Sequence, residues 1–182
     1  MEGFVCEGER VFLRHPVLAD VDEFVSKAMQ SISFHRDLVS PPMDREAFAG
    51  FVEGSNTDSE RRLLVIEKDG NQIAGVLSIS QIFLKGFCSA YLGYYAFEGF
   101  QGRGLMSQGL EGALEYGFEN VGLHRIEANI QPGNASSIEL VKRHGFSKEG
   151  FSRKYLKIGG EWRDHERWAL IVDDWGGKAI SD

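Results

Sequence analysis

The sequence predicts an α/β (α+β) fold in which a mixed, mostly antiparallel central sheet of about seven strands is flanked by about four helices. Segments that alternate apolar and polar residues are interspersed with segments whose apolar residues recur at i, i+3, i+4 and i+7. Turn signals at Asp69-Gly70 and Gly159-Gly160 join strands into hairpins at both ends of this order, which argues against a uniformly parallel sheet. The 182 residues contain no repeat, low-complexity segment or linker, so residues 1–182 are expected to form one domain.

The first predicted elements are a strand and two helices separated by a loop. Glu9–Arg14 alternates in character and predicts a strand. Asp20 with Glu23 three residues later predicts a capping box at the start of a helix. Ser31–Pro42 has no clean period and ends in two prolines, so we expect a loop, with a second helix beginning near Asp44.

The middle of the chain predicts a hairpin, an aromatic strand and a long helix. Leu63–Ile66 and Ile73–Ile79 flank the Asp69-Gly70 turn. Ser89–Phe97 is aromatic and is typical of a strand. The apolar residues that follow, from Leu110 to Val121, have helical spacing and predict an amphipathic helix.

The last third predicts a strand, a short helix and a hairpin. His124–Ile130 is expected to be a strand. Asn134 is expected to cap a short helix that runs to about Arg143 and ends at Gly145. Lys154–Ile158 and Arg167–Val172 are expected to form the final hairpin.

A glycine-rich turn, Gln101–Met106, lies between the aromatic strand and the long helix. Its bare backbone and the helix N-terminus present outward amide groups that suit a phosphate. The same residues are equally consistent with a tight turn between two core elements. A dinucleotide-binding turn is excluded, because the later glycine of Gly-x-Gly-x-x-Gly and the ribose-binding acid are absent from the sequence.

Composition narrows the possible ligands. The net charge of −7 argues against a surface for nucleic acid or an anionic membrane, so a polyanion needs a local basic pocket, for which Arg103, Lys142 and Arg143 are candidates. Cys6 and Cys88 form no Cys-x-x-Cys pair and the five histidines fit no zinc pattern, so we expect no metal. The sequence shows no signal peptide and no membrane-spanning stretch, which favours a cytoplasmic location.

The short helix carries a polar residue on its inward side. Ser137, Leu140, Val141 and His144 fall at i, i+3, i+4 and i+7 and share one face. The Ser137 hydroxyl either bonds local backbone or looks into a cleft beside the glycine-rich turn.

Several motifs in this order resemble a known family. Gln101–Met106, Asn134–Ser137 and His144–Phe146 resemble the acetyl-CoA-binding core of the GNAT N-acetyltransferases. Tyr155–His165 resembles the RimJ/RimL-type ribosomal-protein-alanine N-acetyltransferases. The resemblance extends over Leu13–Trp175 and implies a GNAT fold and an acetyl-CoA-dependent N-acetyltransferase.

The resemblance also implies roles for particular residues. Ser137 would lie near the thioester sulfur as proton donor or thiolate stabiliser, and Asn134 would orient the pantetheine or its loop. The residues expected to bind acetyl-CoA, the co-substrate, are Tyr95, Ala96, Phe97, Gln101, Gly102, Arg103, Gly104, Leu105, Met106, Ser107, Asn134 and Lys142.

The expected acceptor is the N-terminal α-amine of a protein, such as a ribosomal protein, which attacks the thioester directly. The resemblance implies that the chain enters between the Ser31–Pro42 loop and the last hairpin. The residues expected to contact it are Phe34, His35, Tyr91, Tyr155 and Trp162. A small amine such as a polyamine or an aminoglycoside, or a non-catalytic acyl-CoA-binding role, remains an alternative.

The general base and the oligomeric state stay open. A free α-amine with a pKa of about 8 is partly neutral in cells, which relaxes the need for a strong base. Glu127, Asp164 and His165 are available, and the sequence assigns the role to none of them. The protein is expected to be a monomer or a homodimer.

Overall fold

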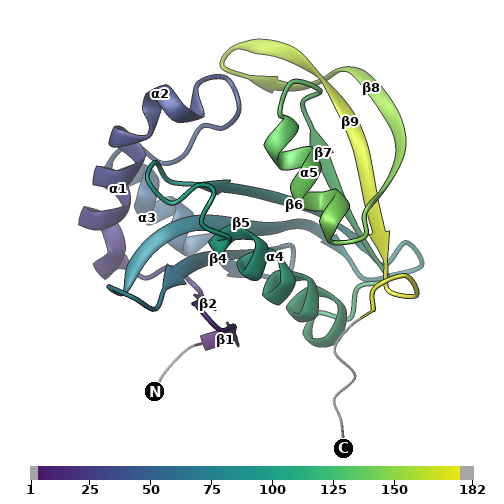
Figure 1. Cartoon of the computed structure of the whole chain (residues 1–182), viewed down its shortest axis with the longest axis horizontal. Coiled ribbons are helices and arrows are strands. Elements are labelled where there is room, and N and C mark those ends of the chain that lie inside the picture. The colour runs from purple at the N-terminus through teal and green to yellow at the C-terminus, as the bar shows by residue number, and fades with distance from the viewer. Residues whose placement is uncertain (1–3, 177–182) are drawn as a thin grey trace, which may run out of the picture.

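The computed structural model describes residues 4–176 and places all strands of that range in one sheet. The order is β1-β2-β4-β5-β6-β7-β9-β8, with β3 beside β4 (Figure 1). The strands are β1 Phe4–Glu7, β2 Val11–Arg14, β3 Asn56–Thr57, β4 Glu60–Glu67, β5 Gln72–Phe83, β6 Ser89–Ala96, β7 Arg125–Ile130, β8 Ser147–Ile158 and β9 Glu161–Ile171.

Five α-helices cover this sheet within residues 4–176. Figure 1 shows α4 and α5 in front of it and α3 behind it, beside α1. The helices are α1 Val21–Gln30, α2 Ile32–His35, α3 Arg45–Glu53, α4 Leu105–Glu115 and α5 Ala135–Arg143. A 3₁₀ turn, Leu18–Asp20, precedes α1, and a π turn, Tyr116–Asn120, extends α4. None of these helices has the length and apolar character needed to cross a membrane.

The predicted mixed, mostly antiparallel α/β fold is confirmed, and the described residues contain two further short strands, β1 and β3, and one further helix, α2. Residues 31–42 were expected to be a loop, and that expectation is wrong for Ile32–His35. One helical turn is too short to produce an apolar period. The turn instead follows from tertiary contact, because the His35 ring packs 5.2 Å from the Tyr95 ring.

The predicted capping box of α1 is also wrong. Asp20 stands at the N-cap, but its carboxylate pairs with Arg14 at 2.6 Å and accepts from the Val17 amide at 2.8 Å. The Glu23 carboxylate accepts from the Ile73 amide at 2.8 Å instead of turning back to the cap. Each carboxylate therefore bonds a group of a neighbouring strand, Arg14 of β2 for Asp20 and the Ile73 amide of β5 for Glu23. A local sequence pattern cannot reveal such contacts.

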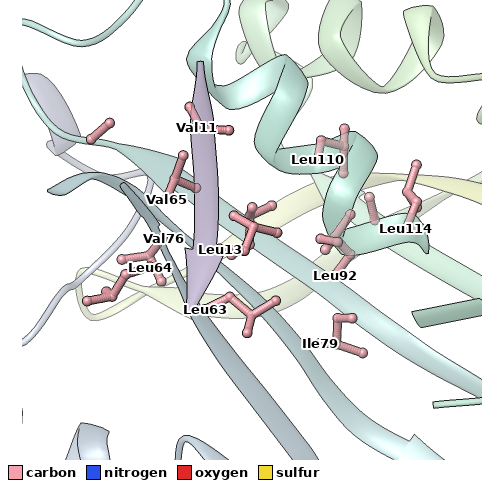
Figure 2. Close-up of a cluster of buried hydrophobic side chains, with 14 of the residues drawn as sticks. Val11, Leu13, Leu63, Leu64, Val65, Val76, Ile79, Leu92, Leu110 and Leu114 are labelled. Carbon is pink, nitrogen blue, oxygen red and sulfur yellow. The ribbon is translucent and has the colours of Figure 1, made fainter. Parts of the chain in front are cut away.

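Helix α4 and the π turn that extends it pack closely on the sheet, because glycines stand among the leucines of the inward face. A Cβ atom on Gly109 would lie 2.9 Å from the Val65 side chain, and one on Gly117 would lie 2.8 Å from the Ile126 side chain. Figure 2 shows Leu110 and Leu114 of this helix over the buried side chains of the sheet. The close contact fixes the position of the N-terminus of α4.

The sheet opens between β6 and β7, the one parallel pair among the strands of residues 4–176. Pairing runs only from Ser89↔Arg125 to Tyr91↔Glu127. Beyond this point β6 continues beside β5 as far as Ala96, and β7 continues beside β9. One edge of β6 is therefore left without a partner strand in the centre of the sheet.

Candidate active site

A cavity of about 250 Å³ lies where β6 and β7 separate, and we call it the β6–β7 cavity. Strand β6 supplies Tyr94 and Tyr95, and the residues after β7 supply Asn134 and Ser137. The cavity is also lined by His165 of β9. Residues far apart in sequence thus converge on the unpaired edge of β6.

The backbone of that edge offers hydrogen-bond groups to an extended ligand. The Phe97 amide donates to the carbonyl of Ala74, a residue of β5, at 2.9 Å, so this amide points toward β5 and away from the opening. Because the bonding direction alternates along an antiparallel pair, the Tyr94 and Ala96 amides point toward the opening, and the Tyr95 amide points toward β5. Of the predicted residues Tyr95, Ala96 and Phe97, only Ala96 presents its amide to the opening. Tyr94 was not predicted.

The glycine-rich turn exposes its backbone at the N-terminus of α4. Gly102 and Gly104 have φ of 72° and 78°, a region that other residues rarely adopt, and a Cβ on either would meet nothing within 4 Å. No side chain among residues 4–176 caps the helix, whose first backbone bond runs from Gln108 N to Gly104 O at 3.2 Å. The amides of residues 105–107 therefore have no acceptor within the helix and form an anion cradle.

The side chains of the turn hold it against the sheet. The Arg103 guanidinium pairs with the buried Glu67 carboxylate, and the Arg103 carbonyl accepts from Arg10 Nη1 at 2.8 Å. Lys142 pairs with Glu139 at 2.9 Å. Arg103 therefore anchors the turn, and Arg10, which the sequence did not indicate, brings a second guanidinium beside it.

The remaining residues of the turn differ in exposure. Leu105 is fully buried, and a Cβ on Gly75 of β5 would lie 2.6 Å from Met106 Sδ, so Met106 packs closely over that glycine. Gln101 is exposed, and Ser107 Oγ lies 3.3 Å from His144 Nε2, which links α4 to α5. The apolar side chains Leu105 and Met106 face the sheet, while the amides of residues 105–107 have no acceptor within the helix.

Ser137 is hydrogen-bonded on both sides. Its hydroxyl donates to the Tyr94 hydroxyl at 2.6 Å, and Tyr94 donates back to the Ser137 carbonyl at 3.1 Å. Asn134 caps α5 as predicted, its side-chain oxygen accepting from the Ser137 amide at 3.2 Å. Burial raises the pKa of Tyr94 to about 12, so its hydroxyl keeps its proton at neutral pH. The Ser137 hydroxyl bonds another hydroxyl inside the cavity, and no backbone group takes it.

A second cavity of about 550 Å³, the hairpin slot, leads toward the first. It lies between the β8–β9 hairpin, the residues after α2 and the loop that joins β7 to α5. Trp162 of β9 is one of the side chains that line it. Leu38, Gln131 and Asn134 line both cavities. Asp37 joins the walls, since its carbonyl accepts from Gln131 Nε2 at 2.7 Å. The structure thus has a cavity where the acceptor was predicted to enter.

The five residues predicted to contact the acceptor differ from one another in position and in exposure. Trp162 lines the hairpin slot and is 59% exposed. A hydrogen bond with Tyr155, together with burial, raises the pKa of Tyr91 to about 12. His35 is buried and its Nε2 lies 2.8 Å from the Ala96 carbonyl, so it supports β6, while Phe34 is exposed on α2. Contact of these side chains with an acceptor stays a prediction.

Two buried polar atoms at the β6–β7 cavity lack partners. They are Asn129 Oδ1 and the Tyr95 hydroxyl, whose pKa burial raises. Within residues 4–176, none of the side chains that line this cavity is a carboxylate. The same range contains no cluster of three His, Cys, Asp or Glu residues suited to a metal ion. The described lining of the cavity thus combines polar and apolar side chains and includes no carboxylate.

Comparisons with known proteins agree with this geometry. Residues 10–147 match the family described as an acetyltransferase (GNAT) domain. The chain is 26% identical over 178 residues to the probable N-acetyltransferase YjcK of Bacillus subtilis, covering 93% of this chain and 98% of that one. It is 40% identical over 111 residues to the [ribosomal protein uS5]-alanine N-acetyltransferase of Escherichia coli, covering 61% of this chain and 57% of that one.

A similar solved structure is Mycobacterium smegmatis RimJ in complex with CoA-disulfide. Its TM-score is 0.81 at 23% identity, over 90% of this chain and 82% of that one.

Proposed function

We propose that this chain, which belongs to the GNAT acetyltransferase family and is an N-acetyltransferase of the RimJ/RimL type, acetylates the α-amine at a protein N-terminus. The observation that carries the choice of acceptor is that no carboxylate lines the β6–β7 cavity within residues 4–176, and that this cavity is reached through the hairpin slot. A polyamine carries further ammonium groups beside the reacting one, and burying an unpaired charge is costly. A peptide can carry a single reactive amine into the cavity while its chain lies in the slot.

Acetyl-CoA fits the residues on the other side of the opening. The free amides at the N-terminus of α4 and the open space above Gly102 and Gly104 suit its pyrophosphate. The amides of Tyr94 and Ala96 suit the pantetheine arm, which can lie along β6 as an added strand. Acetyl-CoA supplies the activated acetyl group, and these residues hold it with its thioester near the cavity.

Ser137 is the proposed proton donor to the departing sulfur. A thiol has an ordinary pKa of about 8.5, so a hydrogen bond to the thiolate helps it to leave near neutral pH. To donate to sulfur, Ser137 must turn from Tyr94, whose hydroxyl can then donate to Ser137 Oγ in place of the Ser137 carbonyl. Tyr94 thereby keeps the serine oxygen bonded in both orientations.

The similarity to an enzyme named for a ribosomal-protein alanine supports an N-terminal acceptor. The net charge of −7 would attract a basic partner such as a ribosomal protein. That attraction should weaken as salt rises, because the Debye length is only about 8 Å at physiological ionic strength.

The test is a competition among amines. Protein and acetyl-CoA are incubated with peptides that begin with Ala, Ser or Met and contain one lysine, and in parallel with spermidine. Mass spectrometry then locates the added acetyl group. We expect acetylation of at least one peptide N-terminus. Modification of spermidine or of lysine side chains, with every N-terminus left free, would overturn the proposal.

A further inference from the structure

His165 is the buried titratable side chain of the β6–β7 cavity that the proposed chemistry has not used. It is 2% exposed and lines the cavity. Its Nδ1 lies 3.0 Å from the Arg163 carbonyl, which can only accept. Nδ1 therefore carries the proton, and in the neutral ring Nε2 keeps a free electron pair.

The strand geometry around His165 explains its surroundings. β8 bulges between Ser152 and Leu156, which pair with His165 and Arg163 of β9. The bulge brings the Tyr155 ring to 5.9 Å from the His165 ring. Asp164 points to the opposite side of β9, where its carboxylate accepts from the Lys154 amide at 2.7 Å.

The charged and titratable groups on the His165 face come from four elements and one loop. Arg163 pairs with Asp37 at 3.3 Å and with Glu161 at 3.1 Å, so its charge is partly balanced. These side chains are Tyr91 and Tyr95 of β6, Glu127 of β7, Tyr155 of β8, Arg163 and Arg167 of β9, and Asp37 after α2, while Tyr94 of β6 reaches the cavity from the opposite face. None of the described carboxylates among them lines the cavity itself, so no acidic side chain there competes for a proton.

A second observation indicates that an N–H donor belongs in this cavity. Asn129 Oδ1 is buried and has no hydrogen-bond partner among the described residues, although it lines the same cavity as His165. Leaving a buried acceptor unpaired costs about 1–3 kcal/mol. An amine that donates one N–H to Asn129 would satisfy that oxygen and bring its nitrogen beside β9.

We propose that His165 Nε2 is the general base that takes the proton of the acceptor amine, with Asn129 Oδ1 holding a second N–H. The assignment rests on the proposed function. The bound ammonium first gives one proton to Nε2, and His165 passes it to water. The neutral nitrogen then forms the C–N bond as the C–S bond breaks, and Ser137 supplies the proton of the departing sulfur. The second proton that the nitrogen loses on becoming an amide returns through water to the Ser137 oxygen, so the step balances without any further reactant.

Two substitutions separate the base from its structural bond. In His165→Asn the side-chain amide can replace Nδ1 and still donate to the Arg163 carbonyl, but nothing replaces Nε2. His165→Gln places an amide near Nε2 that cannot take a proton. Both are expected to lower kcat/KM at pH 7 by about 10²–10⁴-fold with acetyl-CoA affinity within threefold. His124→Asn, on an exposed histidine at the other end of β7, is the matched control and should leave both quantities unchanged.

The pH profile supplies a readout that a structural role would not move. With His165 in place, the pH at which kcat/KM falls on the acidic side of its pH profile (the acidic limb) should be the same for alanyl and β-alanyl peptides. The amines of these two peptides differ in basicity. In His165→Asn the limb should follow the basicity of each amine, since only the fraction already neutral can react. A limb that follows the amine in the wild-type protein as well would overturn the assignment.

Nuclear magnetic resonance tests the tautomer without acetyl-CoA. In ¹³C,¹⁵N-labelled wild-type protein, the imidazole signals of His165, assigned through the backbone, should show a protonated Nδ1 and an unprotonated Nε2. A protonated Nε2 in the neutral ring would overturn the proposal even if both variants fail to fold. If the wild type acetylates spermidine only, the proposed acceptor is wrong, and the same variants assayed with spermidine judge His165 separately. Variants that fold and keep kcat/KM within threefold would refute the role of His165.

Discussion

The two sides of the β6–β7 opening are built in different ways. On the proposed cofactor side the groups that would face the ligand are main-chain amides, supplied by residues 94–107 of one continuous stretch. On the proposed acceptor side they are side chains from three separate segments, represented by Leu38, by Asn129, and by Trp162 and His165 of β9. A backbone site needs only a local conformation, whereas a side-chain site needs the whole sheet to be in register. The two sides should therefore fail separately when they are altered.

The largest effect is expected on the cofactor side, from Gly104→Glu. The new carboxylate would occupy the open space above the anion cradle and repel a phosphate. We expect acetyl-CoA affinity, measured by calorimetry, to fall by at least about a hundredfold, which corresponds to about 2.8 kcal/mol.

The control for this variant is Gly122→Glu. Gly122 has φ of 79° and open space around its Cβ position, so it matches Gly104 in strain and added charge but lies after the π turn. It should show a similar loss of stability with unchanged affinity. Unchanged affinity in a folded Gly104→Glu protein would contradict the assignment of the cradle.

The next effect lies between the two sides, at Ser137. Ser137→Ala should lower kcat by about ten- to a thousandfold and leave acetyl-CoA affinity within a few-fold, because the proposed bond to sulfur strengthens as the thiolate forms. Ser26→Ala in α1 removes another helical hydroxyl that makes one side-chain bond, at 3.1 Å to Gln30, and should leave kcat unchanged. Lower stability with unchanged kcat per folded molecule would show that Ser137 is structural.

The same contrast explains what the sequence could predict. Asn134 was predicted to cap α5 and does so, and the start of a helix was predicted near Asp44, which caps α3; each side chain bonds an amide three residues away. The backbone cradle at Gly102 and Gly104 likewise depends on positive φ, for which glycine is a local signal. Features contained within one turn of chain were therefore predictable.

Features that depend on distant strands were not. Asp20 fits the capping pattern, but Arg14 of β2 takes its carboxylate. Tyr94 and Tyr95 are the same type of residue, and only the packing of α5 shows that it is Tyr94 whose hydroxyl is hydrogen-bonded to Ser137. His165 could not be preferred over Glu127, because nothing local shows which of them lines the cavity.

The smallest effect is expected on the acceptor side, from Trp162→Ala. Trp162 lines the hairpin slot but is 59% exposed, so its contact with an extended peptide would be partial. We expect the KM for the peptide to rise about three- to tenfold, equivalent to about 0.7–1.4 kcal/mol, with acetyl-CoA affinity unchanged. Phe151→Ala removes an aromatic ring of similar exposure, 49%, from β8 outside the slot, and should change neither constant. If Trp162→Ala weakens acetyl-CoA binding as much as it raises the peptide KM, the two sides are not separable and the hairpin belongs to both.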